Sequence, residues 1–354
     1  MSDKPKVDKV GEEIDDIAKK YDLEHKPIRE AVSTGVLGVD FVTELPGIPR
    51  GTIIDLFGAE SLGKTTFALT MIADRVEHGE HCVYMDIEHR LQRKLVDIVI
   101  PINNDLMKFT EPRHGQAAME ELLRLSSNRG VKMIVVDSVA ALFDEGALDP
   151  DNESKAQAKV ARMMSDSLKV LGTVAYDTDT IIVFINQMRD RPMVIAGPTR
   201  APTGGNALKY YSSLRFELQR DSPIKRGERI IGQRVRLIAV KNSFGAPGVR
   251  APMSIIFGEG VDKIRDLVDQ GIELGVIDKS SSWFRYKDIK ANGEDSMAEQ
   301  ALSVLGDLTR DVLTAWHKRK AEQEAEREKR KQAYIAARQT MLAAQAEALA
   351  NVNN

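Results

Sequence analysis

Eight consecutive residues have the types and spacing that hold the phosphates of a nucleotide. Residues 58–65 read GAESLGKT, the complete phosphate-loop pattern G-x-x-x-x-G-K-T. Its glycines let the backbone wrap closely around phosphate oxygens, and N–H groups at the start of a helix hold the anion. The pattern places Lys64 on the β- and γ-phosphates and the Thr65 hydroxyl on Mg²⁺. ATP and Mg²⁺ are therefore the predicted cofactors, and a glycine-rich turn without a ligand is the alternative.

Two carboxylates follow apolar runs and suit magnesium-dependent hydrolysis. Asp137 ends the run MIVVD at residues 133–137, where it would hold Mg²⁺ through water. Glu88 follows the run VYMDI and is the candidate general base that activates the attacking water, with a solvated strand-end carboxylate as the alternative. The candidates for nucleotide binding are Gly58, Glu60, Ser61, Gly63, Lys64, Thr65, Thr66 and Asp137. Thr65 and Asp137 are also the candidate metal site.

Strands and helices must position these residues, and the sequence alternates between the two. Runs of apolar and β-branched residues predict strands over Thr52–Phe57, Cys82–Ile87, Met133–Asp137 and Thr180–Asn186. Helical patterns lie between them, over Thr65–Val76, Gln116–Ser126 and Gln157–Leu171. This alternation predicts an α/β fold with a mainly parallel sheet covered by helices on both faces. Later strands, which we expect to extend the sheet as hairpins, are predicted over Ser213–Gln219, Gln233–Lys241 and Met253–Phe257.

The composition is that of an ordinary globular protein, with 42% hydrophobic and 29% charged residues in a chain of 354. The net charge of −3 means that any nucleic-acid surface must be local. Cys82 is the single cysteine, which excludes an internal disulfide, suits a reducing compartment and predicts a core position. No apolar run approaches the length of a membrane span and no signal-peptide pattern is seen, so we expect a cytoplasmic protein without membrane contact.

The segments that flank the core predict further units. Residues 10–20 have an amphipathic helical pattern that would pack on a neighbouring subunit or dock on its own core. A helix over Lys263–Leu274 and a strand over Trp283–Tyr286 predict a smaller unit, and helix formers dominate from about Ser296. The predicted division is an N-terminal helix with linker at 1–31, the core at 32–262, a small C-terminal α/β domain at 263–310 and a charged, alanine-rich helical tail at 311–354.

Several blocks beyond the phosphate loop resemble the RecA-type homologous recombinases of bacteria and phages. They keep the order and nearly the spacing of that family at residues 58–66, 86–89, 135–142, 161–165, 184–187, 203–209 and 258–260, and the similarity reaches about residue 286. FINQ at 184–187 followed by TGGNALK at 203–209 is the most specific pair. The resemblance implies a RecA-like P-loop core and an ATP-dependent recombinase with DNA-dependent ATPase activity, which acts in recombination and DNA repair.

The same resemblance implies the partners of the chain. Copies of the chain would form a filament on single-stranded DNA, with ATP at the seams between subunits. The filament would pair its strand with homologous double-stranded DNA and exchange strands. Loader or single-strand-binding proteins would be further partners.

The resemblance also implies roles for single residues. The Gln187 amide would contact the γ-phosphate at the foot of a loop at 188–203, so that ATP orders the loop and changes its affinity for DNA. The candidate catalytic residues are Glu88, Lys64, Gln187 and Lys241, of which Lys241 would act across the seam. Long irregular loops in compact cores are usually functional, and arginines there can neutralise phosphates. The candidate DNA-binding residues are Arg162, Ser165, Lys169, Arg189, Arg191, Thr203, Gly204, Gly205 and Asn206.

The chain departs from the family pattern in places that affect these roles. Leu95 stands where the nucleotide base normally stacks on a tyrosine. Of the lysine pair usually spaced K-x-K at the seam, Lys241 is present and Ser243 replaces the second, which predicts slower hydrolysis. The second DNA loop has Ile195 and Ala196 instead of bulkier residues. The tail after Trp316 is basic rather than acidic, and is either a solvated helix or an arm that binds DNA or a partner.

Two other classes of protein stay open at this point. A filament scaffold or regulator could bind DNA under the control of ATP without efficient strand exchange. A ring-forming replicative helicase shares the same core, but we find no primase-binding or linker domain for it. Strand exchange and unwinding of a forked duplex distinguish the three.

Overall fold

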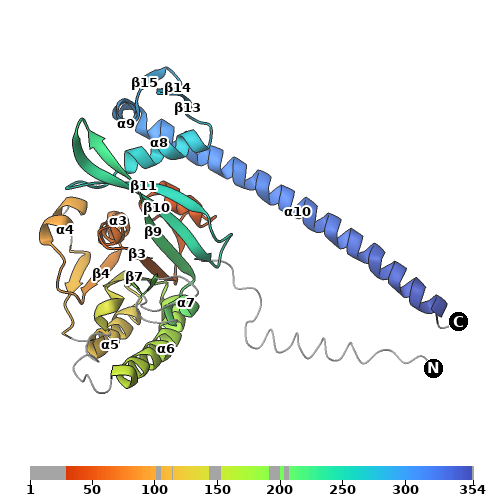
Figure 1. Cartoon of the computed structure of the whole chain (residues 1–354), viewed down its shortest axis with the longest axis horizontal. Helices are drawn as coiled ribbons and strands as arrows, with labels where there is room; N and C mark the ends of the chain where they lie inside the picture. The colour runs from red at the N-terminus through yellow and green to blue at the C-terminus, as the bar shows by residue number, and fades with distance from the viewer. Residues whose placement is uncertain are drawn as a thin grey trace.

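The computed structural model describes residues 29–100, 105–113, 115–142, 153–190, 200–202 and 207–352 (Figure 1). Within these residues a ten-stranded sheet forms the centre of the core. Its strands are β3 (Ile53–Gly58), β4 (His81–Asp86), β5 (Met107–Thr110), β6 (Val131–Asp137), β7 (Ile181–Asp190), β8 (Arg200–Pro202), β9 (Leu214–Arg226), β10 (Arg229–Asn242), β11 (Arg250–Ile256) and β12 (Gly260–Val261). They follow the order β12-β11-β10-β9-β3-β7-β6-β4-β5, with β8 paired to β7 off this path.

The sheet is parallel from β9 to β5 and antiparallel from β9 to β12. The predicted parallel core with a hairpin extension is confirmed. Because parallel strands end at the same edge, the register places Gly58 opposite Gln187 and Asp86 opposite Asp137. Four candidate segments far apart in the sequence therefore meet at one edge of the sheet.

Helices cover both faces of the sheet (Figure 1). One face packs against α3 (Lys64–Glu77) and α4 (Arg93–Val99), and the other against α5 (Gly115–Ser126), α6 (Glu153–Thr178) and α7 (Ala207–Tyr211). Successive strand residues point to opposite faces, so Cys82 and Tyr84 join the first cluster while Val83 and Met85 join the second. Both faces of these central strands are buried, which explains their continuous apolar runs.

Several elements of the core were not predicted from the sequence, among them β5 and α4. These two are short and carry charged residues, such as Lys108 in β5 and Asp97 in α4, so neither produces a long periodic pattern. The other predicted elements are present, with α6, β9 and β10 longer than expected. Cys82 is fully buried, as predicted, and burial raises the pKa of its thiol to about 12.

A small domain follows the core and packs on α2 (Leu37–Val42), which lies just after the strand β1 (Ala31–Val32), itself paired with β2 (Ile48–Pro49). Its elements are α8 (Lys263–Glu273), β13 (Asp278–Ser280), β14 (Trp283–Tyr286), β15 (Ile289–Asn292), α9 (Glu294–Ala301) and the first turns of α10 (Leu305–Val352). Phe284, Met297 and Leu308 are buried in its own hydrophobic cluster. Leu37 and Phe41 of α2 pack against that cluster and join the small domain to the core.

The helix α10 leaves the small domain and extends far from the core (Figure 1). It confirms the predicted helical tail, and it is continuous across residue 310. The predicted helix at 10–20 lies outside the described residues, and the division of the chain into four units stays a prediction. Within the described ranges, no helix is both long and apolar enough to cross a membrane.

Candidate nucleotide site and nucleic-acid interface

The phosphate loop runs from the end of β3 to the start of α3, as its pattern requires. Gly63 precedes α3 with a φ of 83°, in the left-handed region that favours glycine. A Cβ on Gly63 would lie 2.2 Å from Ile255 Cδ1, and one on Gly58 would lie 2.5 Å from the carbonyl oxygen of Leu218. Close packing against the backbone of β9 therefore requires glycine at 58, whereas the left-handed conformation is the main reason for glycine at 63, since the Ile255 methyl can move.

Lys64 is held inside this loop. Its ammonium group donates hydrogen bonds to the carbonyl oxygens of Gly58 at 3.1 Å and Ala59 at 2.7 Å. The residue is 7% exposed, and burial lowers the pKa of its ammonium, while the charges of Asp137, Glu60 and Glu88 act in the opposite direction. The cation is thus positioned before any anion binds.

Thr65 and Asp137 are in direct contact, as expected of residues that share a metal ion. The Thr65 hydroxyl donates to Asp137 Oδ2 at 2.9 Å, and the Tyr84 hydroxyl donates to the same oxygen at 2.5 Å. Burial raises the pKa of the Asp137 carboxyl, and these two hydrogen bonds oppose the shift. A hydroxyl beside a carboxylate is the kind of hard oxygen pair that suits Mg²⁺. Tyr84 was missed because it lies within an apolar strand.

Glu88 and Gln187 are brought together across 99 residues of sequence. Gln187 Nε2 donates to Glu88 Oε1 at 2.9 Å, and the Ser138 hydroxyl donates to that same oxygen. The other oxygen, Oε2, lies 3.3 Å from the exposed guanidinium of Arg90. One Glu88 oxygen is therefore fixed by two neutral donors, while the other faces the open side of the site. Ser138 directly follows Asp137, which is a signal the sequence offered.

These residues line one pocket of about 430 Å³. The predicted residues on it are Glu60, Ser61, Gly63, Lys64, Thr65, Thr66, Glu88, Asp137 and Gln187. The residues that sequence reasoning did not select are Leu62, Asp86, Arg90, Leu91, Ile185, Gln233, Ile255 and Phe257. Gln233 donates to the Ser61 carbonyl at 2.7 Å, and Phe257 is 59% exposed. Leu95 packs on the core cluster instead of lining the pocket.

Similarity to known proteins covers the whole of the strand-and-helix core that carries this pocket. The model of the RecA N-terminal domain family matches residues 14–262. The chain belongs to the RecA family. It is similar to the Protein RecA of a Nitratiruptor species, with 38% identity over 275 residues, 77% of this chain and 79% of that relative. It is also 38% identical to the Protein RecA of Rickettsia massiliae over 261 residues, 74% of this chain and 76% of the relative.

Membership of the RecA family confirms the resemblance noted from the motifs. It confirms the expected ATP-dependent recombinase with DNA-dependent ATPase activity and does not favour the scaffold alternative. The family match ends at residue 262, so the small domain and α10 lie beyond it.

Lys241 lies away from the pocket of its own subunit. It stands near the end of β10, and its ammonium donates to the carbonyls of Lys209 and Tyr210, both at 3.0 Å, at the end of α7. Burial lowers the pKa of this ammonium, and the charge of Arg215 acts in the same direction. The structure thus does not bring Lys241 to Lys64 within one chain.

The predicted DNA loop starts directly at the pocket. Met188 pairs with Pro202 and Asp190 with Arg200, so β7 and β8 hold the two ends of the loop together one residue after Gln187. On α6, Ser165 is half-buried and Lys169 is exposed. The remaining candidates lie outside the described residues, either entirely or in their side chains: Arg162, Arg189, Arg191, Thr203, Gly204, Gly205 and Asn206.

Proposed function

We propose that the chain hydrolyses Mg²⁺-ATP in this pocket and uses ATP binding to control a filament that pairs and exchanges DNA strands. The contact between Gln187 and Glu88 is the observation that carries this proposal. It joins the candidate catalytic base to the residue at the foot of the candidate DNA loop. A change at the γ-phosphate would therefore alter hydrogen bonding on both sides of Gln187.

Lys64, Thr65 and Asp137 would bind the nucleotide. Lys64 would exchange its two carbonyl partners for phosphate oxygens, because a charge-assisted hydrogen bond to an anion is stronger than one to a neutral carbonyl. The Thr65 hydroxyl would bind Mg²⁺ directly, and Asp137 would hold it through water. The metal ion would neutralise charge that develops on the transferred phosphoryl group.

Glu88 would orient the attacking water and accept its proton. Ser138 and Gln187 hold Oε1, so Oε2 is the oxygen available to water. The Arg90 side chain that approaches Oε2 is 79% exposed, and an ion pair at such a position is weak enough for water to replace it. The Phe257 ring offers an apolar surface to the nucleotide base, in place of the tyrosine that Leu95 replaces.

Gln187 would transmit the state of the nucleotide to DNA. In the presence of a γ-phosphate, its amide would donate to phosphate oxygen instead of Glu88. The β7–β8 pair begins at the next residue, so this change would pass to the loop that carries Arg189, Arg191 and residues 203–206. Lys169, exposed on α6 beside Ser165 and Arg162, would contribute to the same DNA surface.

The assembly that we propose is a filament in the cytoplasm or on the nucleoid, with single-stranded DNA bound inside it. Lys241 would reach the γ-phosphate of the neighbouring subunit, which agrees with its distance from its own pocket. Loader and single-strand-binding proteins would assist assembly.

Formation of joint molecules tests the function. Single-stranded DNA is mixed with a homologous duplex in the presence of Mg²⁺-ATP, and a heterologous duplex serves as the control. We expect joints that require homology and that are lost in Lys64→Ala. Binding of single strands without any joints would make the scaffold interpretation the better one.

A mixing experiment tests the seam. Lys241→Ala and Glu88→Gln should each be nearly inactive alone. Their equimolar mixture should recover activity, because about a quarter of random seams combine an intact Glu88 with an intact Lys241 from the neighbour. If Lys241 acted within its own chain, the mixture would stay as inactive as its components.

A further inference from the structure

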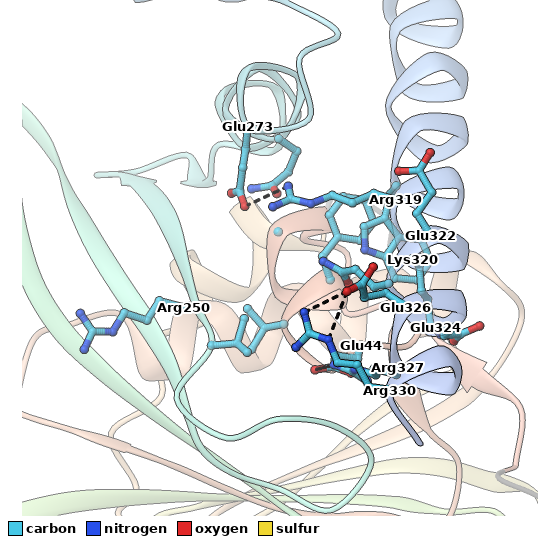
Figure 2. A pocket seen from close by; sticks show the side chains of 17 residues that line it. Glu44, Arg250, Glu273, Arg319, Lys320, Glu322, Glu324, Glu326, Arg327 and Arg330 are labelled. Carbon is cyan, nitrogen blue, oxygen red and sulfur yellow. Dashed lines mark hydrogen bonds and ion pairs between the residues drawn. The ribbon is translucent and has the colours of Figure 1, made fainter. Parts of the chain in front are cut away.

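Contacts with other elements hold α10 along its first part. Trp316 stacks on Phe41 of α2, with ring centroids 4.8 Å apart and an angle of 8° between the planes. Figure 2 shows Arg319 paired with Glu273, and Arg327 donating to both oxygens of Glu44 at 3.1 and 3.3 Å. These contacts hold the helix at a defined angle to the core.

Past Arg327, no ion pair joins the helix to the core among the described residues, although Arg330 still lines the cavity between α10 and the core. We call residues 328–341 the distal arm. Each of them is exposed, and Figure 1 shows this part of α10 projecting into solvent. At 1.5 Å per residue, the distal arm is about 20 Å long. It is a rod that is fixed at one end.

The distal arm is strongly basic for its length. It carries four cations, which are Lys329, Arg330, Lys331 and Arg338, against the one carboxylate of Glu328. The local net charge is therefore +3, whereas the whole chain has −3. A local positive field on a molecule of negative net charge directs a polyanion to this segment.

Ion pairs along the helix leave these cations available. Arg330 pairs with Glu326 at 3.0 Å and Lys331 with Glu328 at 3.7 Å, and every one of these side chains is more than half exposed. Exposed pairs are weak and exchange readily for other anions. Lys329 and Arg338 have no ion pair within the described part of the chain.

The shape of the distal arm fits a duplex groove. Residues 329–331 are consecutive, so at about 100° per residue their side chains fan around the helix instead of sharing one face. Ala333, Ala336 and Ala337 keep the rod slim between these cations and Arg338. A major groove about 12 Å wide admits one helix and has a row of phosphates on each side.

We propose that the distal arm binds double-stranded DNA by lying in its major groove, with its cations on the phosphates of both strands. Binding is independent of sequence, because lysine and arginine on phosphates position a protein without reading bases. Single strands fit less well, since their binding sites use several stacking aromatics and the distal arm offers one, Tyr334. The proposal rests on the recombinase function, in which the arm captures the duplex that the filament then pairs.

Neutralising the arm tests the proposal. The test variant replaces Lys329, Arg330, Lys331 and Arg338 with Gln, and the matched control replaces Lys108, Arg113, Arg124 and Arg129, which are exposed on the core. Binding of a fluorescent duplex of about 30 base pairs is measured by anisotropy over a range of salt. We expect the test variant to bind at least about tenfold more weakly than the parent. The slope of log K against log salt should fall by about 0.9 for each lost phosphate contact.

A second variant tests the groove geometry. Ala333→Pro keeps every cation but breaks the helix, so it should also weaken duplex binding, whereas a flexible basic tail would bind as before. Hydrolysis of ATP stimulated by single-stranded DNA should stay within about twofold of the parent in all variants. The proposal is overturned if the neutralised variant binds the duplex as tightly as the parent, or if the core control loses as much affinity as the neutralised variant. It is also overturned if the neutralised variant loses filament mass in sedimentation while its duplex binding is unchanged. Absence of joint molecules in the parent would instead count against the proposed function.

Discussion

The nucleotide pocket and the distal arm both present cations to phosphates, yet they hold these cations in opposite ways. Lys64 is 7% exposed, donates to two fixed carbonyls and lies in a loop that needs glycine at 58 for packing and at 63 for conformation. The cations of the distal arm stand in solvent with weak, exchangeable partners. A buried charge acts through its exact position, whereas exposed charges act through their number. Removing a single side chain should therefore have a large effect in the pocket and its supporting core, and a small one along the arm.

The largest effect is expected at the catalytic base. Glu88→Gln keeps the size of the side chain but removes its capacity to accept a proton, so turnover of ATP should fall by about 10²–10⁴-fold. Binding of nucleotide should persist, because Lys64 and Thr65 are untouched. Steady-state hydrolysis with single-stranded DNA and binding of a fluorescent nucleotide measure the two quantities. Glu77→Gln, exposed at the end of α3, is the control, and equal rates in the two variants would contradict the role of Glu88.

The core beneath the pocket should be the next most sensitive part. Phe184 in β7 is fully buried in the second hydrophobic cluster. Phe184→Ala removes its contacts and leaves a cavity, which should lower the free energy of unfolding by about 3–5 kcal/mol. Tyr334→Ala in the distal arm, where the residue is 68% exposed, is the control and should change this free energy by less than about 0.5 kcal/mol. Denaturant unfolding measures both, and similar losses would remove the contrast between core and arm.

The junction between core and small domain should respond to pH. Asp266 of α8 is buried against α2, where its carboxyl accepts from the Gly38 N–H at 3.1 and 3.2 Å. Burial raises its pKa from 3.8 to about 8, and the charges of Asp40 and Asp269 act in the same direction while the Gly38 hydrogen bond opposes them. The folded protein thus holds this proton more tightly than the unfolded chain. The stabilisation that protonated Asp266 contributes is complete below about pH 4 and is lost as the pH rises to about 8.

Asp266→Asn should remove this part of the pH dependence. As the pH rises from about 5 to about 8, the thermal midpoint of the parent should fall relative to the midpoint of Asp266→Asn. Circular dichroism measures both midpoints. Asp278→Asn, at an exposed site in β13, should follow the parent. Asp40, whose pKa burial raises to about 6, titrates in all three proteins, and because its charge acts on Asp266, the difference between the parent and Asp266→Asn measures Asp266 together with this coupling. Parallel curves for the parent and Asp266→Asn would contradict this assignment.

The smallest effect is expected where the helix α10 meets the core. Arg327→Ala removes two hydrogen bonds to Glu44, and burial of that carboxylate is incomplete, so solvent screens the pair. Arg327 lowers the pKa of the Glu44 carboxyl, so this pKa should rise toward its ordinary value in the variant. The free energy of unfolding should stay within experimental error of the parent's. A double-mutant cycle with Glu44→Ala would measure the coupling energy between the two residues. A large coupling would show that α10 is fixed more firmly than its exposure indicates.

Much of the core could be predicted from the sequence because its signals are contiguous. Apolar runs such as MIVVD mark strands that are buried on both faces, and the phosphate loop sets its own context of strand and helix. The short elements β5 and α4 gave too weak a pattern for prediction. The pocket residues Gln233 and Phe257 could not be found either, because β10 and β11 reach the phosphate loop only through the order of strands in the sheet.

By itself, the sequence determined which residues can perform chemistry on a nucleotide, since residue type and local spacing suffice for a phosphate loop and for carboxylates at strand ends. The tertiary structure decided which of them meet. Gln187 contacts Glu88, Tyr84 contacts Asp137 and Lys241 stands apart from its own pocket, because each relation depends on the register and order of strands in the sheet. Hydrophobic patterns encode which strands are buried, but not which strands are neighbours.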